Sequence, residues 1–254
     1  MGFYDLPKEE RKKLVPKIEL DIFNDLLNGS QKNTLVYFSD EDTYIRKAAY
    51  LSIGKIHKTN QHPISIIILF LEKLLKSDNE KVRQTVVNAA GELGKTNFES
   101  VVHFFDVGLF DDHHSVRNAV IGSIKKMGEK NPKPVLNWAK KYLHHPDKEV
   151  RREICHGIEL RGRKHPEDIL PLLKELEYDS TTRVKNTLIH VLGQIAYKKG
   201  CWATVVKALN TWKNTELVKK ALDEIVDVHD RYKNFAVLTQ AEAIAYIDRN
   251  YGKK

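Results

Sequence analysis

The sequence predicts an all-α fold, an α-solenoid (superhelix) of about six helix-pair repeats with capping helices at both ends. The main evidence is a β-branched residue followed directly by a basic one, which recurs along the chain. The pairs are Ile45-Arg46, Val82-Arg83, Val116-Arg117, Val150-Arg151, Val184-Lys185 and Val218-Lys219. The first interval is 37 residues and the next four are 34 residues each. A constant interval in this range is typical of stacked-repeat architectures.

Each pair lies in the same local context, which predicts a capped helix. Positions three and seven after the basic residue are apolar in every unit, a spacing that marks one face of an α-helix. An Asp or Asn precedes the basic residue by four to six positions. Such side chains favour helix N-caps because their oxygens accept from unpaired backbone amides. The predicted caps are Asp42, Asp78, Asp112, Asp147, Asp179 and Asn214.

A second helix is expected before each cap. The clearest candidates are residues 98–110, 135–143, 168–176 and 204–212. Pro134 favours a helix start, whereas Pro171 falls inside an apolar-periodic run and predicts a kink. Strand-like alternation of useful length is absent from the sequence. Two helices and two turns therefore fill each 34-residue unit.

The 254 residues are expected to form one repeat domain, because each unit of a solenoid needs to contact only its neighbours. Residues 1–36 form the entry cap, 37–229 the repeats and 230–254 the exit cap. The exit cap has a capping box from Thr239 to Glu242 and a helix stop at Gly252. We expect neither a bilayer-spanning run nor a signal peptide, and the two cysteines predict no disulfide framework. We expect a cytoplasmic monomer that does not contact a membrane.

The net charge of +8 is confined to the middle of the chain. Residues 117–164 hold 13 Lys and Arg against 5 Asp and Glu, while the rest of the chain holds 29 of each sign. A local basic field on the inner helices of a curved stack suits a polyanion. The predicted DNA-binding residues are Arg117, Arg151, Arg152, Arg161, Arg163, Lys164 and Lys185.

Some of these basic residues are also explained by a structural role. Arg117, Arg151 and Lys185 recur at a fixed position beside aspartates, which favours Asp–Arg pairs within and between units. The non-repeating bases, Arg152, Arg161, Arg163 and Lys164, are the better candidates for a binding patch.

Motifs that carry catalysis are not recognisable. The sequence has no Gly-rich phosphate loop, no nucleophile elbow and no zinc-ligand spacing. We therefore expect no cofactor and no metal. Among the 11 histidines, the pairs His113-His114 and His144-His145 are interpreted as turn and cap residues. Packing in the core is expected for Cys155, Trp138, Trp202 and Trp212.

The aspartate, the Val-Arg or Val-Lys pair and the apolar helix that follows resemble the HEAT repeat. Within residues 111–195, Pro134-Val-Leu-Asn-Trp138, Glu149-Val-Arg-Arg-Glu153 and Ile169-Leu-Pro-Leu-Leu173 further resemble bacterial DNA alkylation-repair solenoids of the AlkC and AlkD type. The resemblance is greatest to AlkC. It implies a basic concave groove that grips duplex DNA by its backbone and, in active members, a glycosylase that excises N3- or N7-alkylated bases.

The sequence departs from that family at its catalytic positions. His156-Gly157 stands where AlkC carries a glutamate before the glycine, and Glu159-Leu160 replaces its Arg-Pro. Glu153 and Glu159 are only weak substitutes for a catalytic carboxylate. The leading hypothesis is therefore a protein that binds DNA, damaged or branched DNA included, without excising bases. The alternatives are a scaffold for an acidic protein partner and an alkylpurine DNA glycosylase.

Overall fold

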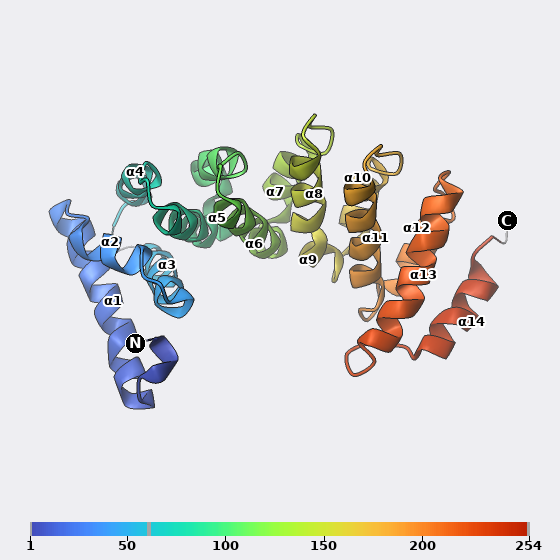
Figure 1. Cartoon of the computed structure of the whole chain (residues 1–254), viewed down its shortest axis with the longest axis horizontal. Coiled ribbons are helices and arrows are strands. Elements are labelled where there is room, and N and C mark those ends of the chain that lie inside the picture. Colours follow the sequence, from blue (N-terminus) through green and yellow to red (C-terminus); the bar gives the residue numbers. More distant parts are fainter. Residues whose placement is uncertain (1, 60–61, 253–254) are drawn as a thin grey trace. The chain divides into compact units, whose positions relative to one another are not determined.

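A computed structural model describes residues 2–59 and 62–252 of the chain, and every regular element in this part is helical. The elements are η1 (Phe3–Asp5), α1 (Lys8–Asn28), α2 (Lys32–Phe38), α3 (Thr43–Lys58), α4 (Ile64–Leu75), α5 (Glu80–Gly108), α6 (His114–Lys130), α7 (Pro132–Lys140), α8 (Lys148–Gly157), α9 (Glu159–Gly162), α10 (Pro166–Lys174), α11 (Thr182–Ala196), α12 (Trp202–Leu209), α13 (Thr215–Arg231) and α14 (Gln240–Asn250). They confirm the predicted all-α solenoid of stacked helix pairs (Figure 1). Within the described residues, no helix is long and apolar enough to span a bilayer.

The helices form two compact units, unit 1 (Met1–Asn131) and unit 2 (Pro132–Lys254). Unit 1 holds the pairs α2/α3, α4 with the first part of α5, and the rest of α5 with α6. The backbone of Asn97, with φ −131° and ψ 56°, interrupts α5 and separates the second helix of one pair from the first helix of the next. The predicted helix at 98–110 thus begins after a one-residue break rather than after a loop.

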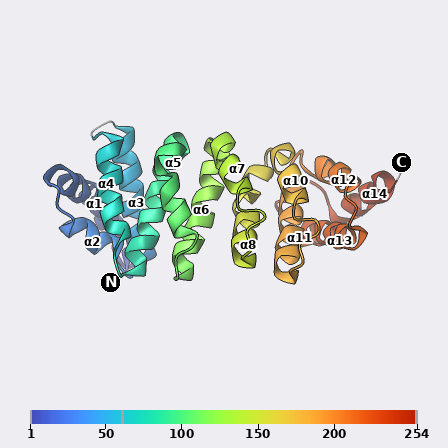
Figure 2. The ribbon, with the colours of Figure 1, turned by 90° about the horizontal axis from the view of Figure 1, so that it is seen from above.

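Unit 2 holds the pairs α7/α8, α10/α11 and α12/α13, with the short α9 between α8 and α10 and with α14 packed on α13. We call the first helices of these pairs (α7, α10 and α12) layer A and the second helices (α8, α11 and α13) layer B. In layer B, α11 packs between α8 and α13 (Figure 2). The expected capping box of Thr239 and Glu242 opens α14.

The predicted apolar stripe forms the core. Of its twelve positions, eleven are buried, from Ala49 in α3 to Leu222 in α13, and Val226 is half-buried. The tryptophans also pack: Trp138 and Trp212 are buried, and Trp202 makes an edge-to-face contact with Tyr246. The Cys155 thiol is buried as well, and this burial raises its pKa, so it is an inert core group.

The repeated arginine holds the turn that leads into its own helix. In four units, Nη1 of the arginine donates to the backbone carbonyls five and six residues earlier. Arg83 donates to Ser77 O and Asp78 O at 2.9 and 3.0 Å, and Arg151 makes the same bonds to His145 O and Pro146 O at 2.7 and 2.9 Å. The equivalent donors are Arg46 and Arg117. This side chain therefore supplies the donor that the carbonyls of the turn lack within either helix.

Two of these arginines also link successive helix pairs, which confirms the predicted Asp–Arg pairing. Arg83 Nε and Nη2 lie 2.7 and 3.0 Å from the carboxylate oxygens of Asp111. Arg151 Nε and Nη2 lie 2.6 and 3.1 Å from those of Asp179. In both pairs the aspartate follows the arginine by 28 residues.

The arginine-held turn also explains where the cap predictions were wrong. Asp42, Asp147 and Asn214 cap their helices as predicted. In the other three units, the helix starts one or two residues later than predicted. The carbonyls of Asp78 and Asp112 accept from the arginine that holds the turn, and the carboxylate of Asp179 accepts from Arg151 of the preceding unit. The N-cap positions there are Asn79 instead of Asp78, His113 instead of Asp112 and Thr181 instead of Asp179.

We expect Arg151→Ala to lower the free energy of unfolding by about 3 kcal/mol, because it leaves the buried Asp179 carboxylate without its guanidinium partner. Urea unfolding followed by circular dichroism measures this loss. Arg249→Ala is the control, since the exposed Arg249 donates only to the carbonyl of Ala245 in its own helix. A loss no larger for Arg151→Ala than for Arg249→Ala would contradict the linking role.

The same ion pairs predict a loss of stability in acid. Burial by itself raises the pKa of Asp179, but the hydrogen bonds from Arg151 and Thr181 outweigh it and hold the pKa below its ordinary 3.8. A carboxyl whose pKa is lower in the folded chain stabilises the fold above its unfolded pKa, and the contribution disappears as the pH falls through the folded pKa. Unfolding midpoints measured from pH 7 towards pH 2 should therefore converge for wild type and Arg151→Ala.

Candidate ligand-binding surface of unit 2

Unit 2 carries nearly all the surplus charge. It holds 23 Lys and Arg against 16 Asp and Glu, a formal charge of +7 out of the total of +8. Which of these cations face a ligand depends on the partners that each one has in the fold.

The predicted bases of the repeated ladder divide into two kinds. Arg117 and Arg151 hold turns, as described above, and Arg151 also donates to Thr181 Oγ1 at 3.0 Å. Lys185 is different, because it lies half-buried on α11 and lines a groove with Asn214 and Glu216. Of these three residues, Lys185 is the one that the fold brings to a groove.

The non-repeating bases are not brought together into one patch. Arg161 lies on α9, and its Nε and Nη2 are 2.8 and 2.7 Å from Asp168 Oδ2. Arg163 donates to Glu159 Oε1 and, at 2.8 Å, to Gln194 Oε1. Lys164 is exposed in the turn before α10. Carboxylates therefore neutralise Arg161 and Arg163.

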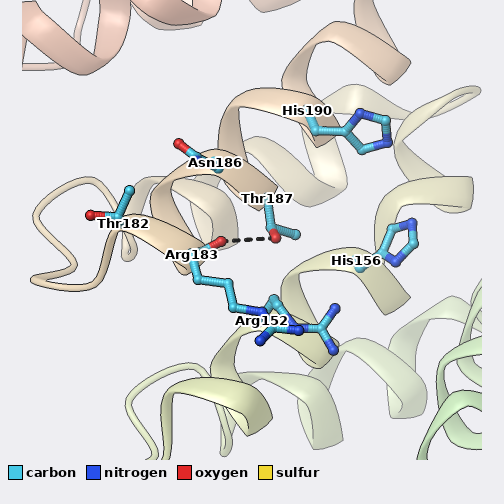
Figure 3. A pocket seen from close by; sticks show the side chains of 7 residues that line it. All are labelled: Arg152, His156, Thr182, Arg183, Asn186, Thr187 and His190. Carbon is cyan, nitrogen blue, oxygen red and sulfur yellow. Dashed lines mark hydrogen bonds between the residues drawn. The ribbon is translucent and has the colours of Figure 1, made fainter.

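The remaining predicted base, Arg152, lines an open groove between α8 and α11. The groove has a volume of about 550 Å³. Figure 3 shows its lining residues: Arg152, His156, Thr182, Arg183, Asn186, Thr187 and His190. Within it, the guanidinium groups of Arg152 and Arg183 lie close to each other.

Both guanidinium groups contact one carboxylate. Arg152 Nε is 2.9 Å from Glu149 Oε2, and Arg183 Nε is 3.2 Å from Glu149 Oε1. Arg152 also lies 3.4 Å from the buried Glu153. The side chain of Arg183 is 64% exposed, so its outward N–H groups are accessible to a ligand. Sequence reasoning missed Arg183, because it precedes the repeated pair and has no counterpart in the ladder.

A second groove, of about 230 Å³, follows on the other side of α11, between α11 and α13. Its cations are Lys185 and Lys220, and it shares Thr182 and Asn186 with the first groove. The two grooves thus form one surface on layer B, with α11 as the ridge between them.

Histidines occupy the first groove near the C-terminal end of α8. His156 Nε2 is 3.2 Å from Glu159 Oε2. His190 lies beside His156, with ring centroids 6.1 Å apart. Burial lowers the pKa of His190, although the carboxylates of Glu159 and Glu224 partly offset this effect. The sequence does carry a signal for the two rings, because each stands five positions after the basic residue of its unit.

The histidines predicted as turn and cap residues lie elsewhere. Nδ1 of His113 accepts from Ser115 N at 3.4 Å, and Nδ1 of His145 accepts from Asp147 N at 3.1 Å. These bonds confirm the local structural role that was expected for His113 and His145.

A close approach of α9 to α11 positions the histidine end of the groove. A Cβ atom on Gly162 would lie 2.5 Å from Ile195 Cδ1 and 2.9 Å from its Cγ1. The missing side chain lets α9 lie against α11. Glu159 on α9 therefore comes within reach of both histidines.

Stacked helix pairs joined by arginine-held turns define a HEAT-like repeat protein. No protein-family model matches this sequence, and neither does any curated protein. The fold is similar to that of AlkD2 from Streptococcus mutans, with a TM-score of 0.55 and 18% identity over 83% of this chain and 96% of that chain. It is also similar to a structure from the TOG domain array that crescerin uses to regulate microtubules in the primary cilium. The TM-score is 0.50, with 20% identity over 73% of this chain and 85% of that chain. At these identities the likeness is one of fold.

Gly162→Ala should lower the free energy of unfolding by about 1–3 kcal/mol, because the added methyl group overpacks the contact with Ile195. Gly122→Ala in α6 is the matched control. A Cβ on Gly122 meets nothing within 4 Å, so this substitution should stabilise the chain by roughly 0.5–1 kcal/mol. Chemical denaturation of both variants measures the two changes in the free energy of unfolding, which should have opposite signs. Equal changes would contradict the close approach of α9 to α11.

Proposed function

We propose that the chain binds DNA by its phosphate backbone, with little sequence specificity, through layer B of unit 2. The observation that supports this most directly is the pair of adjoining grooves on either side of α11. Their cations are Arg152, Arg183, Lys185 and Lys220. These side chains come from α8, α11 and α13, which are neighbours in layer B. Packed helices lie about 8–10 Å apart. A row of this kind can neutralise several phosphates along one backbone.

The side chains between the cations suit the same ligand. Thr182, Asn186 and Thr187 line the grooves with hydroxyl and amide groups. Such groups commonly bond phosphate oxygens, which fix the position of a duplex but carry no sequence information. Glu149, Glu153 and Glu216 are the acidic neighbours of the row. Glu149 contacts Arg152 and Arg183, and Glu153 contacts Arg152, so part of the arginine charge is compensated within the fold. The contact of Glu216 with Lys220 is exposed on both sides and therefore weak.

This proposal revises the residues that were expected from the sequence. Arg152 and Lys185 stay in the site, and Arg183 and Lys220 join it. The other five predicted bases leave the site. Arg117 and Arg151 hold turns, Arg161 and Arg163 form ion pairs, and Lys164 lies in the turn between α9 and α10.

Two likenesses support DNA as the polyanion. The sequence of residues 111–195 resembles the alkylation-repair solenoids, and the fold is similar to that of AlkD2. The resemblance of sequence covers part of the chain, whereas the likeness of fold covers most of it.

Base excision is not part of the proposal, because of where the two candidate carboxylates lie. Glu153 is 3% exposed and Glu159 is 1% exposed. Each is engaged by a neighbouring cation, Glu153 by Arg152 and Glu159 by Arg163. A glycosylase needs a carboxylate that can reach the sugar of the target nucleotide. We therefore expect release of alkylpurines from methylated DNA to stay at the uncatalysed level.

Reversing both groove arginines tests the DNA surface. If about four phosphates are neutralised, the affinity of wild type for a duplex should fall with salt at a log–log slope of about −3 to −4. In Arg152→Glu/Arg183→Glu, the slope should become shallower by about 2, and the loss of affinity should be the same for unrelated sequences. Fluorescence anisotropy over a salt series measures both quantities.

Lys207→Glu is the control for this experiment, because Lys207 is an exposed cation of the same unit but lies on α12 in layer A. It lowers the net charge without touching the grooves and should leave the slope within about half a unit of wild type. Equal losses from the two surfaces would show that any bound DNA is held by net charge alone. A wild-type chain that binds no duplex, nicked or branched DNA would refute the proposal.

An acidic protein is the second candidate ligand, favoured by the likeness to the TOG domain array that crescerin uses to regulate microtubules. The same groove cations would hold it. A tagged chain that retains its partner after nuclease treatment, and loses it in Arg152→Glu/Arg183→Glu, would establish this alternative.

A further inference from the structure

We propose that His156, Glu159 and His190 form a binding site for a divalent transition-metal ion, with Zn²⁺ as the reference ion, at the histidine end of the α8–α11 groove. One ligand atom from each residue lies within 4.8 Å of the other two. Among the described residues, this is the one group of three or more His, Cys, Asp and Glu side chains whose ligand atoms converge in this way.

The separations suit a tetrahedral ion. With metal–ligand bonds of about 2.0–2.2 Å, the ligand atoms of a tetrahedral site lie about 3.4 Å apart. His156 Nε2 and Glu159 Oε2 already lie 3.2 Å apart. His190 is 43% exposed, and one of its ring nitrogens lies within 4.8 Å of the ligand atoms of both other residues.

The carboxylate is held in place from behind. The side chain of Glu159 is 2% exposed, and Arg163 donates to its Oε1 atom. Arg163 is itself fixed by Gln194 Oε1 at 2.8 Å. This leaves Oε2 directed towards His156. Outer partners that orient a ligand in this way are a regular feature of metal sites.

His190 also has a carboxylate near its ring. Its Nδ1 atom lies 3.8 Å from Glu224 Oε1, across the boundary between α11 and α13. This separation is longer than a hydrogen bond, so the carboxylate favours positive charge at the ring without fixing its orientation. Glu224 is in turn held by Arg231 Nη2 at 3.0 Å.

The repeat explains why two histidines meet here. His156 and His190 are 34 residues apart, one repeat interval, and Glu224 follows after another 34. Successive pairs stack in register, so these equivalent positions come from neighbouring helices α8, α11 and α13. Elsewhere a histidine faces a glutamate without a second imidazole, in the exposed pairs His103–Glu72 and His144–Glu175.

The donor set indicates the class of ion. Two imidazoles and one carboxylate suit Zn²⁺ and its neighbours Co²⁺, Ni²⁺ and Cu²⁺, whereas Mg²⁺ and Ca²⁺ prefer oxygen ligands throughout. Three protein ligands leave a coordination position for water or an anion. Two of the three ligands, His156 and His190, line the groove that Arg152 and Arg183 also line.

The site is tested on the full chain without nucleic acid, so the outcome is independent of DNA binding. After treatment with a chelator, isothermal titration with Zn²⁺ should show one site per chain. Co²⁺ should bind with a visible d–d absorption band, which Zn²⁺ removes and excess Mg²⁺ does not. His156→Ala and His190→Ala should each weaken Zn²⁺ binding by more than 100-fold, because loss of an outer partner alone costs 10–100-fold.

His144→Ala is the matched control, since it removes an imidazole that faces Glu175 in the same unit. It should leave the affinity for Zn²⁺ and the Co²⁺ band unchanged. His156 and His190 are 33% and 43% exposed, so both alanine variants should keep the circular dichroism spectrum of wild type. Glu159→Gln is not used, because it also breaks the buried contact with Arg163. A wild-type chain without a Zn²⁺ site, or histidine variants that bind like wild type, would overturn the proposal.

Discussion

The structure depends on one recurrent interaction, an arginine on the second helix of a pair that donates to two carbonyls of the preceding turn. Carbonyls in a tight interhelical turn have no partner in either helix, so a side chain that donates to them holds the turn in one conformation. Arg46, Arg83, Arg117 and Arg151 supply that partner from the same position in successive units. Because the donor sits at a fixed offset from the turn, the start of each helix is fixed relative to the repeat.

A constant helix start keeps the stacked units in register, and the register decides which residues become neighbours. Side chains one and five positions after the repeated basic residue lie on the same helical face. In unit 2 they include Arg152 and His156 on α8, Asn186 and His190 on α11, and Lys220 and Glu224 on α13. The two grooves of layer B and the histidine cluster are therefore consequences of one periodic face.

The fold separates cations that stabilise it from cations that can bind a ligand. Arg151 and Arg163 belong to the most basic stretch of the sequence, yet buried or half-buried carboxylates engage both of them. Arg183 lies outside that stretch and is the most exposed arginine of the groove. Formal charge along the sequence therefore does not show which cations the fold pairs with carboxylates and which it leaves exposed.

The sequence by itself determined the repeat, the pairing of helices and the buried stripe, because these follow from periodicities that are local to each helix. It also indicated the Asp–Arg links, since their partners recur at a fixed offset. Only the tertiary structure decided that Asp179 pairs with Arg151 instead of capping α11, and that Glu159 lies between Arg163 and His156. Those outcomes depend on how closely neighbouring helices approach, as at Gly162, and that distance is set by packing between units rather than by the sequence of either helix alone.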